Sequence, residues 1–318
     1  MSFFVYTSRC VTLSKIVILK VLTQAIPLNG TTVELFIRRE DLIHPFVSGN
    51  KFRKLKYNLL EAQKQHHSNL LSFGGAFSNH IAALAYAGKE AGMKTIGIIR
   101  GEELCDQIES NPTLHFAQQC GMEFEFVTRE AYRNKTDADF IQKLKEKYSD
   151  FYLVPEGGTN ELAIQGCQEI LTADDVQYDF VCTAVGTGGT ISGVINSAFE
   201  GQKILGFPAL KGDFLQKDIC KFVQNKNWEL INEYHFGGYA KVTEELIQFL
   251  NNFYNEYGIP LDPVYTGKMV FGVMDRIKQN YFPEHSKILL LHTGGLQGID
   301  GMNDFLKKKK LPILNYYG

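Results

Sequence analysis

Residues 39–54 read REDLIHPFVSGNKFRK, and the rest of the chain is organised around them. Polar and turn-forming residues up to Asn50 give way to apolar residues three or four apart, which predicts a helix over residues 52–65. Asn50 is a plausible N-cap, so we expect Lys51 in the first turn of that helix. The positive end of the helix dipole opposes an ammonium charge and helps to lower the pKa of Lys51, as a Schiff-base lysine requires. Taken alone, a lysine is more commonly a solvated surface charge.

The bulk composition excludes several classes of protein. The chain has 318 residues, 44% of them hydrophobic and 21% charged, as in an ordinary soluble globular protein of about two domains. The net charge of -2 gives no electrostatic reason to expect nucleic acid or an anionic membrane as a partner. Six scattered cysteines indicate neither a metal site nor a disulfide framework, so we expect reduced thiols and a cytoplasmic location. Charges interrupt the apolar runs near the N-terminus, which predicts no signal peptide or membrane span, and residues 1–15 receive no role.

Strand-like and helix-like segments alternate along most of the chain, which predicts crossover units and parallel sheets. The predicted strands cover residues 31–38, 69–73, 94–99, 123–127, 151–154, 180–185, 203–207 and 287–291. The predicted helices cover residues 52–65, 79–91, 111–119, 137–148, 161–171, 190–198, 214–224, 242–254 and 269–280.

The clearest local signal is a glycine-rich loop between a strand and a helix, formed by Gly186, Thr187, Gly188, Gly189 and Thr190. Free backbone N–H groups converge at such a helix N-terminus and favour an anion, and the two threonine hydroxyls can add hydrogen bonds. A tight turn with nothing bound is one alternative. Dinucleotide binding is another, but it expects an acidic residue about 20 positions later, and residues 204–208 contain none. The Walker lysine is also missing, so the phosphate of a mononucleotide-sized cofactor fits best.

Two further loops present polar side chains. Residues 73–80, FGGAFSNH, form a second corner between a strand and a helix. Ser78 or Asn79 would cap that helix, or a substrate carboxylate would bind the exposed amides with Ser78 as a donor. Residues 262–268, DPVYTGK, form a rigid loop, and Tyr239 follows two glycines in the same way. Because the chain has fifteen tyrosines, packing is the simpler role for any one of them.

Taken together, these stretches resemble the fold-type II pyridoxal-phosphate enzymes of the 1-aminocyclopropane-1-carboxylate deaminase and D-cysteine desulfhydrase family, which are similar to the tryptophan synthase β chain. The match runs in order from about residue 30 to the C-terminus. The resemblance implies two α/β domains, each an open, mostly parallel sheet flanked by helices, with pyridoxal 5′-phosphate in the cleft between them. It places residues 62–154 in a small domain inserted into a large one made of residues 1–61 and 155–318.

The resemblance also implies roles for individual residues. Lys51 would bind the cofactor covalently, and Asn79 would donate to the oxygen on its ring. The phosphate would lie on the loop from Gly186 to Thr190 with Lys54 nearby. Ser78 would contact the substrate carboxylate or assist proton transfer. Tyr239 and Tyr265 would be the two active-site tyrosines of the family. Thr266 would face the pyridine nitrogen of the cofactor.

Thr266 separates the branches of the family. The ring-opening deaminases have glutamate there, which keeps the pyridine nitrogen protonated and makes the cofactor a strong electron sink. A threonine hydroxyl carries no charge and cannot hold that proton as a carboxylate does. The resemblance therefore favours a D-cysteine desulfhydrase-like β-elimination from a small amino acid, giving a 2-oxo acid, ammonia and sulfide.

Two alternatives stay open. One is ring opening of 1-aminocyclopropane-1-carboxylate to 2-oxobutanoate and ammonia, and the other is a non-catalytic pyridoxal-phosphate-binding protein on the same scaffold. Phe77 stands where related chains have glutamine, and residues 292–297, HTGGLQ, lack the usual small residue and proline after the glycines. Both departures would reshape the substrate pocket. The resemblance further implies a homodimer.

Overall fold

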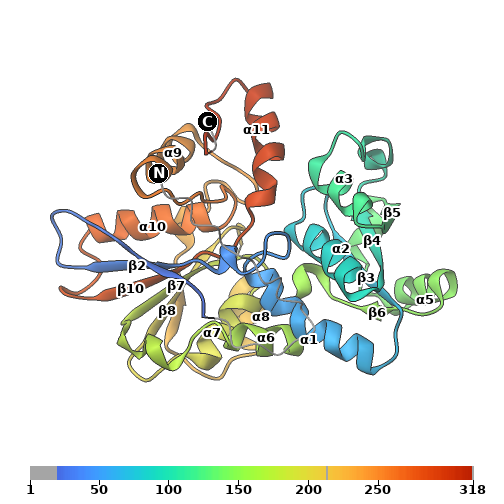
Figure 1. Ribbon diagram of the computed structural model, residues 1–318, viewed down its shortest axis with the longest axis horizontal. Helices are drawn as coiled ribbons and strands as arrows, with labels where there is room; N and C mark the ends of the chain where they lie inside the picture. The colour runs from blue at the N-terminus through green and yellow to red at the C-terminus, as the bar shows by residue number, and fades with distance from the viewer. Residues whose placement is uncertain (1–19, 213, 317–318) are drawn as a thin grey trace, which may run out of the picture.

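The computed structural model describes residues 20–212 and 214–316, which form two sheets with helices on both sides of each (Figure 1). The larger sheet contains, in spatial order, β1 (Thr23–Ile26), β2 (Glu34–Arg38), β10 (Lys287–Leu291), β7 (Phe180–Val185), β8 (Lys203–Pro208) and β9 (Trp228–Leu230). The smaller sheet contains β5 (Met122–Val127), β4 (Lys94–Arg100), β3 (Asn69–Gly74) and β6 (Tyr152–Leu153). Among these strands only β1 and β2 pair antiparallel. The predicted fold class, two mostly parallel sheets flanked by helices, is confirmed.

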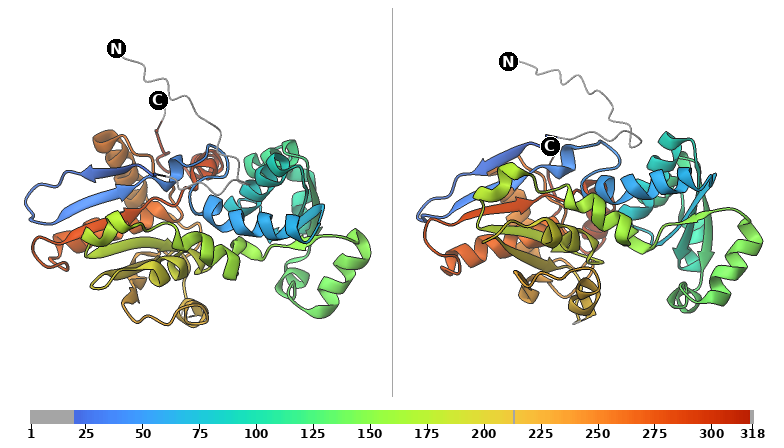
Figure 2. Two further views of the ribbon diagram at one scale, coloured as in Figure 1. Left: turned by 60° about the horizontal axis from the view of Figure 1, so that its bottom comes forward. Right: turned by 90° about the horizontal axis from the view of Figure 1, so that it is seen from below.

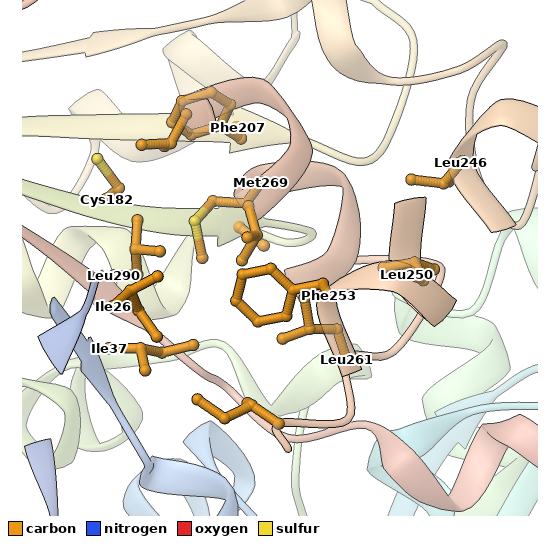
Figure 3. Close-up of a cluster of buried hydrophobic side chains, with 14 of the residues drawn as sticks. Ile26, Ile37, Cys182, Phe207, Leu246, Leu250, Phe253, Leu261, Met269 and Leu290 are labelled. Atoms are coloured by element: carbon orange, nitrogen blue, oxygen red, sulfur yellow. The ribbon is translucent and has the colours of Figure 1, made fainter. Parts of the chain in front are cut away.

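The strands of the larger sheet are apolar on both faces because helices cover both. In β10, Ile288 and Leu290 belong to one buried cluster while Leu289 and Leu291 belong to another, as the two-residue repeat of a strand requires. The first cluster is covered by α9 (Glu244–Tyr257), α10 (Thr266–Lys278) and α11 (Ile299–Lys308). Figure 3 shows part of this cluster, in which helical Phe253 and Met269 lie beside Leu290. The second cluster is covered by α6 (Glu161–Gln168), α7 (Gly189–Ser197) and α8 (Phe214–Cys220).

The smaller sheet is covered in the same way. On one face lie α1 (Asn50–Lys64), α2 (Asn79–Ala91) and α3 (Pro112–Gln119), and on the other lie α4 (Arg129–Arg133) and α5 (Ala138–Tyr148). Figures 1 and 2 show α1 between the two sheets, where it contacts both α2 and α6. The loops that follow β7 and β10 contact the start of α1, where Asn50 bonds Thr190 and Thr293. The domain boundaries at 61/62 and 154/155 stay a prediction.

The observed elements differ from the predicted ones mainly at their ends. The short strands β1 and β9 at the two edges of the larger sheet were not predicted. Helix α10 begins at Thr266 instead of residue 269, and α8 ends at Cys220 instead of residue 224. Residues 1–15 lie outside the described part of the chain. Within that part, no helix combines the length and the apolar character that crossing a membrane requires.

Candidate active site

The turn before Lys51 is built around Gly49. Helix α1 begins at Asn50, and Gly49 is its N-cap with φ 61° and ψ -136°, a conformation that favours glycine. A Cβ atom at Gly49 would lie 2.0 Å from the carbonyl oxygen of Thr293, so a side chain has no room there. The prediction that Asn50 caps the helix is wrong, because its amide instead donates to Thr190 Oγ1 at 2.9 Å. This bond joins the start of α1 to the glycine-rich loop.

Two buried ion pairs hold the same turn from the other side. Arg53 binds Glu40 through two hydrogen bonds of 2.9 and 3.0 Å, and Arg39 binds Asp41 through bonds of 2.9 and 2.8 Å. The carbonyl of Glu40 also accepts the Gly49 N–H at 3.1 Å. Because bidentate guanidinium pairs fix geometry as well as charge, they explain why arginines and acids flank the lysine in this stretch.

Lys51 has the electrostatic properties of a reactive amine. Its Nζ donates to Asn50 Oδ1 at 3.0 Å. Burial, and after it the positive charge of Lys54, lowers the pKa of Lys51 from its ordinary value to about 7. A substantial fraction of the amine is therefore neutral at pH 7 and able to act as a nucleophile. Loss of solvent, and not the helix dipole expected from the sequence, is the main cause of the lowered pKa of Lys51.

Lys54 lies where a phosphate would require it. Its Nζ donates to the carbonyl of Gly157 at 2.9 Å, to Thr159 Oγ1 at 3.0 Å and to Thr187 Oγ1 at 3.4 Å. These partners are neutral oxygens, and burial lowers the pKa of Lys54 to about 8. Within residues 20–212 and 214–316, neither Lys51 nor Lys54 forms an ion pair with a carboxylate, and the charge of Lys54 acts on the Lys51 amine.

The loop from Gly186 to Thr190 completes the cradle. It follows β7 and ends at the N-terminus of α7, where Gly188 is the N-cap with φ 84°. A Cβ atom at Gly189 would lie 2.8 Å from Thr159 Oγ1 and 3.1 Å from Lys54 Nζ, so glycine leaves this space open. Exposed amides, threonine hydroxyls and unpaired lysines are the donors that a phosphate accepts from. The residues therefore fit pyridoxal phosphate, and Lys51 stays the residue expected to bind it covalently.

The corner after β3 faces the same space. Ser78 is the N-cap of α2 and accepts the Ile81 N–H at 3.3 Å, so the capping role is observed. Asn79 follows and accepts a hydrogen bond from Gln297 at 2.6 Å. A pocket is lined by Lys51, Asn79, Thr293, Gln297 and their neighbours. His80 lies behind them: burial, then the charges of Lys51 and Lys54, lowers its pKa well below the ordinary value, so its ring is neutral.

The two tyrosines lie together at the glycine-rich loop. The rings of Tyr239 and Tyr265 are 6.1 Å apart in an edge-to-face arrangement. A Cβ atom at Gly186 would lie 3.1 Å from the Tyr265 ring, which places that ring against the loop. Burial, then the neighbouring Tyr239 and Asp262, raises the pKa of Tyr265 well above its ordinary value. Its hydroxyl is therefore protonated at neutral pH and can act as an acid.

Thr266 is fully buried at the start of α10. Its backbone N–H donates to Asp262 Oδ2 at 2.8 Å, and its hydroxyl lies 3.3 Å from that of Thr293, which lines the Lys51 pocket. Asp262 also accepts from the backbone N–H groups of Val264 and Tyr265 at 3.0 and 2.7 Å. This carboxylate therefore sets the positions of Tyr265 and Thr266 together.

Sequence reasoning assigned no role to three residues that arrange the site. Asp262 and Lys268 were quoted only as part of a motif. Lys268 Nζ donates to the carbonyls of His235 and Gly238, both at 2.9 Å, and so holds the loop that carries Tyr239. Thr159 Oγ1 lies 2.6 Å from Thr187 Oγ1. A buried charge close to active-site residues is the signal that marks Asp262 and Lys268, but burial is seen only in the folded chain.

Comparison with known proteins identifies the family. The family model described as "Pyridoxal-phosphate dependent enzyme" matches residues 20–294. A mitochondrial bifunctional D-cysteine desulfhydrase/1-aminocyclopropane-1-carboxylate deaminase of Arabidopsis thaliana is 31% identical over 85% of this chain and 74% of its own. A D-cysteine desulfhydrase of Yersinia pestis is 26% identical over 82% of this chain and 86% of its own.

A solved structure agrees. The crystal structure of an ACC deaminase homologue superposes with a TM-score of 0.79 and 27% identity, covering 91% of this chain and 93% of the other. The family match and the fold coincide with a lysine of lowered pKa, Lys51, at the start of the helix that contacts the glycine-rich loop. The chain belongs to the pyridoxal-phosphate-dependent enzymes, within the 1-aminocyclopropane-1-carboxylate deaminase and D-cysteine desulfhydrase family.

Proposed function

We propose that this protein catalyses β-elimination from a small amino acid, with D-cysteine as the first substrate to test. The observation that carries the proposal is Thr266, a neutral side chain at the position expected to face the pyridine nitrogen. Thr266 is fully buried, and its hydroxyl lies beside that of Thr293. Thr293 in turn lines the pocket that contains Lys51. The nearby Asp262 carboxylate does not replace a glutamate there, because its oxygens accept three backbone N–H groups.

The residues of the chain supply positioning and proton transfer. Pyridoxal phosphate, when bound, provides an electron sink for the charge that develops at the substrate Cα. The amides of the Ser78 corner bind the substrate carboxylate and so orient the Cα–H bond. The neutral form of Lys51, favoured by a pKa of about 7, accepts the Cα proton on Nζ. Loss of the thiol from Cβ and addition of water convert D-cysteine into pyruvate, hydrogen sulfide and ammonia.

A neutral residue at Thr266 suits this reaction. In an elimination the leaving group departs from Cβ as charge builds at Cα, so charge need not spread far into the cofactor ring. A weaker electron sink is then sufficient. Relatives whose names include D-cysteine desulfhydrase support the proposal, although the same comparisons include deaminases.

The second candidate is ring opening of 1-aminocyclopropane-1-carboxylate, and one observation favours it. That substrate has no Cα proton, so the reaction needs an acid or nucleophile at the ring. Tyr265, whose raised pKa keeps it protonated, and the neighbouring Tyr239 are available for this purpose. The Arabidopsis relative is named for both activities, which supports keeping both substrates in the assay.

The proposal is tested with Thr266→Glu, and Thr266→Ser serves as a control that keeps the hydroxyl. We expect Thr266→Glu to reduce the release of sulfide from D-cysteine, while the serine variant stays close to wild type. Cofactor content, measured by absorbance, shows whether the glutamate variant is still loaded. Full desulfhydrase turnover in a loaded Thr266→Glu variant would remove the basis of the proposal.

A further inference from the structure

A second cavity lies beside the active site, against the smaller sheet. Its volume is about 560 Å³, and its lining includes Arg100, Arg129, Tyr132, Arg133, Lys135 and Glu156. Arg100 is the last residue of β4, α4 follows β5, and Glu156 follows β6. The cavity thus opens at the carboxyl ends of parallel strands, the edge at which ligands bind in open α/β sheets.

Arg100 joins this cavity to the active site. A Cβ atom at Gly75 would lie 3.7 Å from Arg100 Nη2, which places the guanidinium against the corner that carries Ser78. On the opposite wall, Glu156 immediately precedes Gly157, whose carbonyl accepts from Lys54.

The cavity carries an excess of positive charge. Its one carboxylate is already engaged: Glu156 accepts the Tyr132 hydroxyl at 2.7 Å and pairs with Lys135 at 3.2 Å. Arg129 pairs with the exposed Glu103. In the described ranges, Arg100 and Arg133 have no carboxylate partner.

Arg100 is an exposed residue, and its guanidinium lies over the ring of the buried Tyr132. Tyr132 is 4% exposed, and its ring has Arg100 Cζ at 5.7 Å and Lys135 Nζ at 4.7 Å from its centroid. Cations over a ring face are attracted to it and lose freedom of movement. A positioned guanidinium that lacks an anion is a ready partner for a planar or tetrahedral oxyanion, which it binds through two parallel N–H groups.

We propose that this cavity is a subsite for the side-chain oxyanion of an acidic amino acid, with Arg100 as its main binding residue and Arg133 beside it. The inference rests on the proposed function, since it places the α-carboxylate of the substrate at the Ser78 corner. It deepens that function by assigning a preference within it: among small amino acids, those with a negatively charged group on the side chain bind more tightly than neutral substrates of the same size, D-cysteine among them.

Aspartate and asparagine are the matched probes, because they differ in charge and hardly in shape. Both enantiomers of each are titrated into the cofactor-loaded enzyme, and binding is followed by the change in the visible absorbance of the cofactor. At low salt, we expect one enantiomer of aspartate to bind at least about tenfold more tightly than asparagine. A hydrogen bond between charged groups contributes about that much to the binding free energy. Higher salt reduces the difference.

Two variants assign the difference to a residue. Arg100→Gln is expected to weaken aspartate about tenfold and asparagine much less, so the preference disappears. Arg129→Gln removes a charge from the same cavity, but that charge is already paired with Glu103, so the preference should remain. Thermal unfolding of each variant establishes that it is folded.

Three results would overturn the proposal. The wild type could bind aspartate and asparagine with equal affinity, or Arg100→Gln could reduce the affinity for both ligands equally. Arg129→Gln could also lose the preference for aspartate as fully as Arg100→Gln does. The equal loss of both ligands would instead assign Arg100 to the α-carboxylate or to the fold. Turnover of D-cysteine by the wild type is measured separately. If the wild type does not turn over D-cysteine, that result counts against the proposed function. The preference for a charged side chain is then judged from the titration alone.

Discussion

Gln297 Nε2 donates a hydrogen bond to Oδ1 of Asn79 at 2.6 Å. Asn79 is the first residue of α2, and Gln297 lies in the short turn before α11, so the bond connects the two sides of the pocket that contains Lys51. It also fixes the amide of Asn79. With Oδ1 turned to Gln297, Nδ2 lies beside Gly295, where an added Cβ atom would be 2.9 Å away. The donor that Asn79 offers to the pocket is thereby determined.

This relationship predicts that Gln297→Glu weakens cofactor binding more than Gln297→Leu. Glutamate has nearly the shape of glutamine but only accepts, so Asn79 would turn Nδ2 toward it and lose the donor that faces the pocket. Loss of one hydrogen bond costs about 1 kcal/mol, or about fivefold in the dissociation constant. Equilibrium dialysis of the cofactor measures this. Wild-type affinity in Gln297→Glu would show that Gln297 does not orient Asn79.

The buried lysines predict how stability depends on pH in the protein without cofactor. The pKa values of Lys51, Lys54 and Lys268 fall to about 7, 8 and 8 in the folded chain, and burial is the first cause for each. Between these values and the ordinary value of 10.5, the unfolded chain holds more protons than the folded one, so stability rises with pH.

We therefore expect the thermal midpoint of the cofactor-free protein to increase from pH 6.5 to pH 9, measured by calorimetry in buffers of matched ionic strength. Lys51→Met is the control, since an apolar side chain of similar length removes one titrating group and should flatten the rise. A midpoint that falls over this range, or an unchanged slope in Lys51→Met, would contradict the assignment.

The close approach at Gly49 predicts a large cost for Gly49→Ala. The new Cβ atom would lie 2.0 Å from the Thr293 carbonyl oxygen, so either the Lys51 turn or the strand end must move. Gly92→Ala is a matched control, because Gly92 also has a positive φ, 68°, but nothing within 4 Å of the added atom. The control should lose about 1 kcal/mol, the usual cost of alanine in that conformation.

Urea unfolding compares the two variants, and Gly49→Ala should lose clearly more free energy of unfolding than Gly92→Ala. It should also bind less cofactor, because Lys51 and Thr293 line one pocket. Equal losses in the two variants would mean that the turn before Lys51 moves aside easily.

Elements bounded by strong local signals could be predicted from the sequence. The apolar run of β7 lies between charged and glycine residues, and the predicted strand over residues 180–185 matches it. The edge strand β1, with the sequence TQAI, lacks such a pattern because its stability comes from pairing with β2. Helix α10 begins three residues before its predicted start because the Asp262 carboxylate accepts three backbone N–H groups there.

Contacts between distant residues explain the rest of the differences at the site. Asn50 has the local features of a cap, but its partner Thr190 is 140 residues away. The two departures from the family pattern are Phe77 and the stretch of residues 292–297, which ends at Gln297, and both make contacts across the pocket. A Cβ atom at Gly301 in α11 would lie 3.0 Å from the Phe77 ring, and Gln297 bonds Asn79. The sequence alone does not show that Phe77 and Gln297 connect the segment around α11 with the start of α2.

The most direct test combines the absorbance spectrum of the purified protein with a titration. The wild type loaded with pyridoxal phosphate should show the visible band of a lysine-bound cofactor, and Lys51→Ala should lose that band and all turnover. The protein is then titrated with D-cysteine, L-cysteine and 1-aminocyclopropane-1-carboxylate while 2-oxo acid, ammonia and sulfide are measured. The account predicts pyruvate and sulfide from D-cysteine. A Lys51→Ala variant that keeps turnover would contradict the central claim, and 2-oxobutanoate from the cyclopropane without sulfide from D-cysteine would assign the protein to ring opening.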